Sequence, residues 1–117
     1  MPINEYKFYN GVVLNGLVES GKAIKIEEFP TSSKNSFMLN GNKVGIYIKH
    51  SKKVISPWRF TFLKEHQEEF NEMSKLCENA FLILVCSNDG IASIKSTALK
   101  KVLDENVEPA EWISASR

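Results

Sequence analysis

A stretch without a single acidic residue runs from Phe29 to Lys64 and mixes lysines with aromatic side chains. Its 36 residues hold seven basic side chains, whereas the rest of the chain holds eight basic and 14 acidic ones. The formal net charge of +1 therefore hides a strong asymmetry. Cationic groups neutralise phosphates, and exposed aromatic faces stack on unpaired bases. These residue types predict a surface for a nucleic acid, or for a protein that handles one, built from Tyr47, Lys49, His50, Lys52, Lys53, Trp58, Arg59 and Lys64.

The same stretch allows two other interpretations. Lysines along a hairpin also discourage aggregation of exposed strand edges, in which case Trp58 and Phe60 would belong to the core. Alternatively, the partner is an acidic protein, and the chain is a protein-interaction or inhibitor domain that uses the hairpin edge or an exposed Trp58. Binding that weakens steeply with salt would separate phosphate contacts from an apolar protein contact.

Histidines and carboxylates add few chemical possibilities by spacing alone. His50 ends the predicted strand beside Lys49, but spacing places no nucleophile or acid near it. His66 falls on the apolar stripe of a predicted helix, which is typical of a hydrogen-bonded, half-buried histidine. Glu27 and Glu28 are the carboxylates nearest to Lys49, and they predict either a salt bridge or a metal site. Because no phosphate-binding glycine loop and no paired Cys/His spacing occurs, we expect no cofactor.

A hairpin around Asn40 and Gly41 should position the basic residues, since both turn positions favour a positive φ. A two-residue turn would place Leu39 opposite Asn42. One face of the hairpin then carries apolar side chains and should meet the core: Phe37, Leu39, Val44, Ile46 and Ile48. The opposite face is expected to be exposed and carries Met38, Lys43, Gly45, Tyr47 and Lys49. An aromatic ring and an ammonium group would therefore project together into solvent.

Hydrophobic periodicity predicts the remaining elements. Apolar spacing indicates helices over 6–20 and from residue 63 to about 77, and a period of two indicates a strand over 22–29. The continuous apolar run 81–86 predicts a buried central strand, paired across a turn at 87–90 with a strand over 90–95. We also expect a short extended segment, a short helix and a last strand, over 58–62, 97–105 and 111–115.

This order predicts one α+β (or α/β) domain over residues 1–117, with a mixed sheet of five to six strands, an N-terminal β-hairpin and helices packed on it. The longest apolar run has seven residues, far below the roughly 20 that cross a membrane. The first residues contain no basic region followed by an apolar run, so we expect no secretory signal. Cys77 and Cys86 are expected to be buried, reduced thiols of a cytoplasmic protein. The alternative is a single disulfide between them, which their spacing also allows. The oligomeric state is also open.

The order helix, three strands, helix and strand over residues 6–86 resembles the core of the restriction-endonuclease-like, or PD-(D/E)XK, nuclease superfamily. In that family an acid on the second strand and an acid-x-Lys on the third bind a divalent metal, often with an acid from the first helix. The resemblance matches Lys49 to the lysine and Glu19 to the helix acid. Tyr47 stands where the motif has its carboxylate, and the preceding strand, SFMLN, has no acid.

Divalent cations take oxygen ligands, usually including carboxylates. The expected function is therefore a nucleic-acid-associated binding module that is not catalytic by itself. The alternative is a metal-dependent nuclease that uses Mg²⁺, with its acids displaced to Glu19, Glu27 or Glu28 around Lys49.

Overall fold

The computed structural model describes residues 5–29, 35–53, 58–87, 90–98 and 110–115. The elements in chain order are α1 (Glu5–Glu19), β1 (Ile26–Glu28), β2 (Ser36–Leu39), β3 (Val44–Ser51), β4 (Trp58–Leu63), α2 (Lys64–Leu76), β5 (Asn79–Cys86), β6 (Gly90–Lys95) and β7 (Ala110–Ala115).

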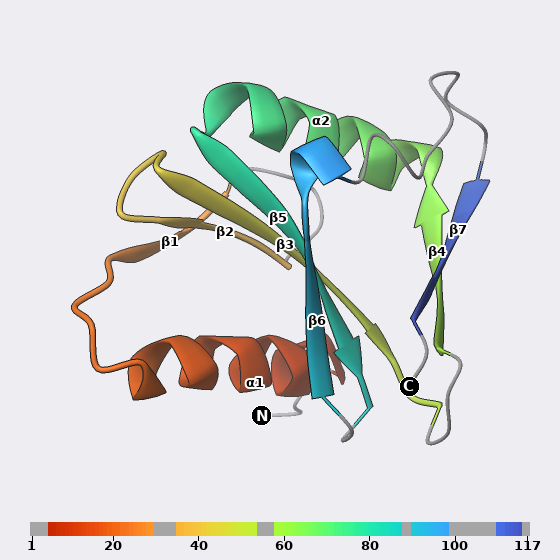
Figure 1. Ribbon diagram of the computed structural model, residues 1–117, viewed down its shortest axis with the longest axis horizontal. Helices are drawn as coiled ribbons and strands as arrows, with labels where there is room; N and C mark the ends of the chain where they lie inside the picture. The colour runs from red at the N-terminus through yellow and green to blue at the C-terminus, as the bar shows by residue number, and fades with distance from the viewer. Residues whose placement is uncertain (1–4, 30–34, 54–57, 88–89, 99–109, 116–117) are drawn as a thin grey trace.

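A five-stranded mixed sheet in the order β1-β2-β3-β5-β6 forms the centre of the molecule. β3 pairs antiparallel with β2 and parallel with β5, and β6 returns antiparallel beside β5. β4 and β7 form a separate two-stranded antiparallel ribbon. The two helices lie on opposite sides of the five-stranded sheet (Figure 1). The predicted α+β fold with a mixed sheet and a hairpin is confirmed.

Most predicted elements are present with shifted ends. The two long helices and the central strand appear as α1, α2 and β5, whereas the strand predicted over 22–29 is reduced to Ile26–Glu28. Residues 58–62 belong to β4, and the last strand is β7. The helix predicted over 97–105 falls largely outside the described residues, as do Asn88 and Asp89 of the predicted turn at 87–90.

The β2–β3 hairpin turns where predicted but is longer than expected. Asn40 and Gly41 adopt the positive φ values of 54° and 73°. Leu39, however, lies opposite Val44 instead of Asn42, so four residues connect the strands. A difference of two residues leaves every side chain on its predicted face, because strand side chains alternate with a period of two.

Contacts with the start of β5 explain the longer connection. The carbonyl of Asn42 accepts a hydrogen bond from the Glu78 N–H (2.9 Å), and that of Lys43 accepts one from the Asn79 N–H (3.0 Å). Asn42 and Lys43 therefore turn towards the segment that begins β5, which leaves Val44 as the first residue paired with β2.

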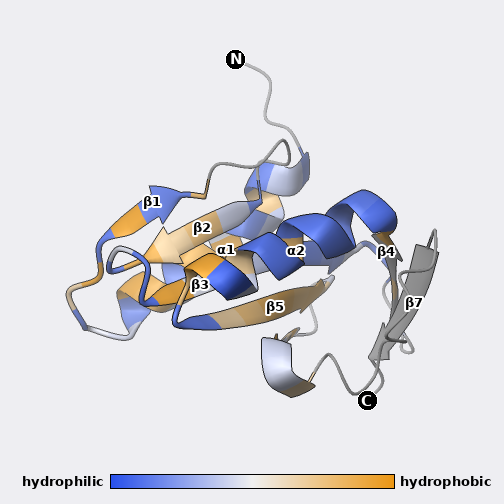
Figure 2. Cartoon of the chain, turned by 90° about the horizontal axis from the view of Figure 1, so that it is seen from above, coloured by the Kyte–Doolittle hydropathy of each residue, from blue (hydrophilic) through white to orange (hydrophobic). Residues whose placement is uncertain are grey.

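Two apolar clusters cover the two faces of the sheet. α1 contributes Val13 to the cluster that holds the predicted core face of the hairpin: Val13, Leu39, Ile46, Ile48, Ile83 and Val85, with Phe37 and Val44 at its margin. α2 covers the other face in a second cluster, which includes Tyr47, Phe70, Met73, Cys77, Leu82 and Leu84. The outer surface of α2 is hydrophilic, whereas the strands beneath it are hydrophobic (Figure 2).

The expectation that the second hairpin face is exposed is therefore wrong. β3 lies in the middle of the sheet and pairs over its whole length with β5, a strand that is buried on both faces. A neighbour of such a strand is covered by the same helices, so its second face is buried as well. Gly45, whose Cβ would lie 2.6 Å from Met73 Cγ, marks how closely α2 approaches β3.

Candidate functional site

Four ionisable side chains meet between β3 and α2. The Tyr47 hydroxyl donates a hydrogen bond to Glu69 Oε1 (2.9 Å), and Lys49 Nζ lies 3.0 Å from His66 Nδ1. We call Tyr47, Lys49, His66 and Glu69 the β3–α2 polar cluster. Tyr47 is fully buried, whereas the other three are half-buried, so the cluster extends from the core towards solvent.

Strand and helix periodicity bring the cluster together. Tyr47 and Lys49 are two residues apart on β3, so both point towards α2. His66 and Glu69 are three residues apart on α2, and Phe70 and Met73 continue the same inward stripe. The Tyr47 ring meets the Phe70 ring edge-on, with centroids 6.1 Å apart, which fixes the ring beneath the helix.

Burial controls the charges of the cluster. Desolvation lowers the pKa of Lys49 from 10.5 to about 8, although the nearby Glu69 carboxylate opposes this change. Burial and the Lys49 charge lower the pKa of His66, against the opposing effects of Glu69 and Glu65. A neutral His66 accepts through Nδ1, so the Lys49 amine donates this hydrogen bond.

Replacing Lys49 by methionine should therefore stabilise the protein at neutral pH. The folded protein binds the Lys49 proton less tightly than the unfolded chain, so the wild type is penalised below pH 8 and recovers stability between about 8 and 10.5. The gain in Lys49→Met is at most about 3 kcal/mol near pH 7, and solvent near the amine reduces it.

Urea unfolding of both proteins from pH 6 to 10.5 measures this difference. The advantage of Lys49→Met should shrink as the pH rises above 8. A constant difference across this range would contradict a desolvated Lys49 amine.

Two aromatic members of the predicted surface are buried instead. Tyr47 is 0% exposed and Trp58 is 3% exposed, so neither can stack on a base. The Trp58 indole N–H donates to the Lys53 carbonyl (2.6 Å), which satisfies its only polar group. Trp58 and Phe60 join the core cluster beneath α2, as the alternative interpretation of the basic stretch predicted.

The predicted basic residues of β3 divide between the two faces of the sheet. His50 lies on the α1 side, where its ring stacks on Tyr9 with centroids 4.2 Å apart. Glu5 accepts contacts from both His50 Nε2 (3.2 Å) and Lys52 Nζ (3.1 Å). Lys52 holds the pKa of the Glu5 carboxyl below its usual range. Lys49, in contrast, faces α2, so these residues form no common surface.

The remaining basic residues lie at several ends of the fold. Lys43 is exposed at the hairpin turn, Lys53 is exposed beyond the end of β3, and Lys64 is exposed at the first position of α2. The side chain of Arg59 is outside the described part of the structure. β2 lies between β1 and β3, and residues 44–47 of β3 lie between β2 and β5, so this part of the hairpin offers no free edge.

The candidate acids are not assembled around Lys49. Glu27 is exposed and forms a salt bridge with Lys25 (3.4 Å). Across the sheet, Glu27 lies opposite Met38, and Met38 lies opposite Gly45, which is four residues before Lys49. Two strand spacings and four residues along β3 place the Cα atoms of Glu27 and Lys49 about 16 Å apart. Glu19 ends α1 on the far side of the sheet. Within the described ranges, no three His, Cys, Asp or Glu side chains are placed to hold a metal ion.

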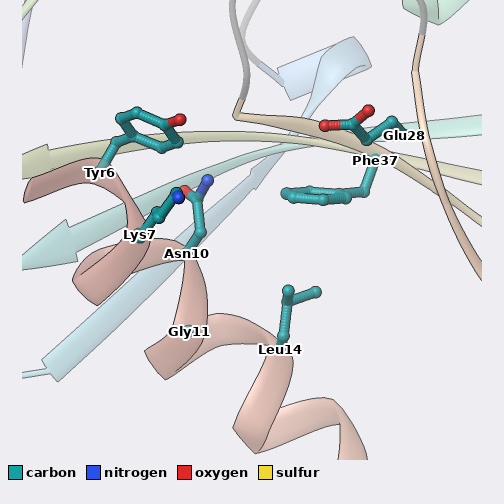
Figure 3. Close-up of a pocket in the computed structure, with 7 residues that line it drawn as sticks. All are labelled: Tyr6, Lys7, Asn10, Gly11, Leu14, Glu28 and Phe37. Atoms are coloured by element: carbon teal, nitrogen blue, oxygen red, sulfur yellow. The ribbon is translucent and has the colours of Figure 1, made fainter. Parts of the chain in front are cut away.

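Glu28 lines a cleft on the α1 side of the sheet, opposite to the β3–α2 polar cluster. The cleft measures about 390 Å³ and lies between α1 and the β1–β2 edge (Figure 3). Its polar and apolar lining includes Tyr6, Lys7, Asn10, Leu14, Glu28 and Phe37. The cleft contains none of the predicted basic or aromatic site residues, and only Glu28 among the candidate acids.

Sequence reasoning named Tyr47 and Lys49 but missed Glu69 as their neighbour. Its prediction for His66 is confirmed, because this histidine is half-buried and hydrogen-bonded on the inner stripe of α2. Glu69 lies three residues after His66, and this spacing indicates that both side chains lie on the same face of α2.

Both cysteines are buried in the cluster beneath α2 and form no disulfide with each other. Burial raises the pKa of the Cys77 thiol, which keeps it protonated.

Neither described helix combines the length and hydrophobicity that a membrane crossing requires. Comparison of the chain with protein-family models, curated proteins and solved structures gives no match.

Proposed function

We propose that this chain is a nucleic-acid-associated binding module, not catalytic by itself, that contacts phosphates through exposed lysines at the two ends of β4. The observation that carries the proposal is the acid-free stretch, whose exposed cations include Lys53 and Lys64. Lys53 is fixed at the start of β4 by the hydrogen bond from Trp58, and Lys64 directly follows the last residue of β4.

The spacing of these two lysines suits an extended polyanion. Six residues of β4 span about 20 Å, which corresponds to several phosphates along a duplex. Because Tyr47 and Trp58 are buried, the contact uses charge and not base stacking. We therefore expect binding with little sequence preference and a steep dependence on salt.

Neutralising both lysines should weaken binding and its salt dependence together. Each phosphate contact contributes a slope of about −0.9 to a plot of log affinity against log salt, so Lys53→Gln with Lys64→Gln should reduce the slope by about two. Fluorescence anisotropy with single- and double-stranded DNA and RNA between 50 and 200 mM salt measures the change.

A matched control replaces Lys22 and Lys95, which are also exposed but lie outside the acid-free stretch. This pair should leave the slope unchanged. The proposal is rejected if the wild type binds no nucleic acid at low salt, or if the control pair weakens binding equally.

The same assays separate the two alternatives. A partner retained at high salt would favour an apolar protein contact, for which α1 exposes Phe8, Val12 and Val18. Cleavage of plasmid or RNA with Mg²⁺ or Mn²⁺, lost in Lys49→Ala, would favour the metal-dependent nuclease. The cytoplasmic location and the likeness to the PD-(D/E)XK superfamily remain predictions alongside this proposal.

A further inference from the structure

We propose that Lys49 is an imine-forming lysine, the amine that this chain presents to aldehydes in preference to its other lysines. The proposal is independent of nucleic-acid binding. It rests on the position of the amine in the β3–α2 polar cluster, half-buried and 3.0 Å from an imidazole nitrogen.

Within the described residues, β3 and α2 both contribute groups around the amine. Tyr47 is its neighbour on β3, and α2 contributes Glu65, His66 and Glu69 as the groups whose charges or hydrogen bonds shape the site. The Tyr47 hydroxyl donates to Glu69, which ties this carboxylate to the strand while its charge acts on Lys49. The cluster therefore holds the amine in one place, whereas a surface lysine moves on a flexible stem.

An amine must lose its proton before it can attack a carbonyl carbon. Burial lowers the pKa of Lys49 to about 8, so about one fifth of the amine is neutral at pH 7.4. A lysine with the ordinary pKa of 10.4 is neutral in fewer than about one molecule in a thousand. The neutral fraction is therefore about 200-fold larger for Lys49. Desolvation of this kind is the usual route by which a lysine becomes a Schiff-base nucleophile.

His66 is a positioning residue in this account. As a neutral imidazole it accepts an N–H of Lys49 through Nδ1. This hydrogen bond occupies one hydrogen of the amine and does not occupy the lone pair of the deprotonated nitrogen. The amine thus stays oriented when it becomes nucleophilic.

The reaction balances without any further cofactor. The neutral Lys49 amine attacks the aldehyde carbon to give a carbinolamine, and proton transfer through water neutralises the oxygen and nitrogen. Loss of one water molecule then forms the C=N bond of the imine. Added cyanoborohydride supplies a hydride to the imine carbon, and water supplies the proton, which leaves a stable secondary amine.

Formaldehyde at trace level with cyanoborohydride tests the proposal on the full chain. Peptide mass mapping gives the methylation rate of each lysine separately from the N-terminal amine, whose ordinary pKa is also near 8. At pH 7.4 we expect Lys49 to react at least 10-fold faster than Lys22 and Lys95, with a rate that levels off above pH 8. A Lys49 rate equal to or below that of these exposed lysines would overturn the proposal.

Three variants distinguish a shaped site from mere burial. Glu69→Gln removes a charge that raises the pKa of Lys49, so the midpoint of the rate profile should move to lower pH. His66→Gln keeps a hydrogen-bond acceptor and should retain the preference for Lys49, whereas His66→Phe should reduce it. Circular dichroism confirms folding of each variant. An unshifted midpoint in folded Glu69→Gln would contradict the assigned cluster.

Discussion

Replacing Tyr47 by alanine should destabilise the protein by about 3–5 kcal/mol, the range for removing a large aromatic side chain from a core. The ring is 0% exposed and packs edge-on against Phe70. Its removal would leave a cavity between β3 and α2 and would leave Glu69 without the hydroxyl that donates to it. Urea unfolding followed by circular dichroism measures the change in the free energy of unfolding.

Tyr47→Phe is the matched control, because it keeps the ring and removes only the hydroxyl. The hydroxyl donates to the Glu69 carboxylate, so this variant should lose about 1–3 kcal/mol, less than Tyr47→Ala. A loss below about 1 kcal/mol in Tyr47→Ala would instead indicate an exposed ring, and it would restore the surface that the sequence suggested.

Gly45→Val should also destabilise the protein, by about 1–3 kcal/mol or more, even though valine favours strands. A Cβ at this position would lie 2.6 Å from Met73 Cγ, 2.7 Å from Met73 Sδ and 2.9 Å from Cys77 Sγ. Met73 is fully buried, so it cannot swing aside into solvent. The steric cost at the β3–α2 contact should therefore exceed the gain in strand propensity, as measured by urea unfolding.

Gly11→Ala provides a control of opposite sign. A Cβ at Gly11 meets no atom within 4 Å, and the residue lies inside α1, where alanine is favoured over glycine by about 1 kcal/mol. Gly11→Ala should stabilise the protein, and Gly45→Val should destabilise it. A Gly45→Val protein as stable as the wild type would show that α2 does not rest on β3 at this position.

The parts of the fold that local sequence patterns determine were predictable. Apolar spacing located α1 and α2, and the continuous apolar run located β5. The Asn40-Gly41 pair located the hairpin turn, because few other residues tolerate positive φ at both positions. The apolar face of the hairpin was also assigned correctly, since the alternation of side chains survives a register shift of two residues.

The second face of β3 could not be assigned from its own residues. Tyr47 and Lys49 have polar ends that suit solvent, and only the pairing of β3 with β5 places them beneath α2. The hairpin length likewise depended on contacts distant in sequence, from Glu78 and Asn79 to the connecting residues. Strand alternation places His50 and Lys49 on opposite faces of β3. Because α1 and α2 cover opposite faces of the sheet, His50 packs against α1 and Lys49 faces α2, which the residues of β3 alone did not indicate.

Nuclear Overhauser effects of the Tyr47 ring protons test most directly whether α2 covers this face of β3. The structure predicts cross-peaks from Tyr47 to the rings of Phe70 and His66, whose centroids lie 6.1 and 6.3 Å away, in a ¹³C-labelled sample. A Tyr47 ring that shows contacts only within β2 and β3, and that exchanges magnetisation with water, would contradict the account.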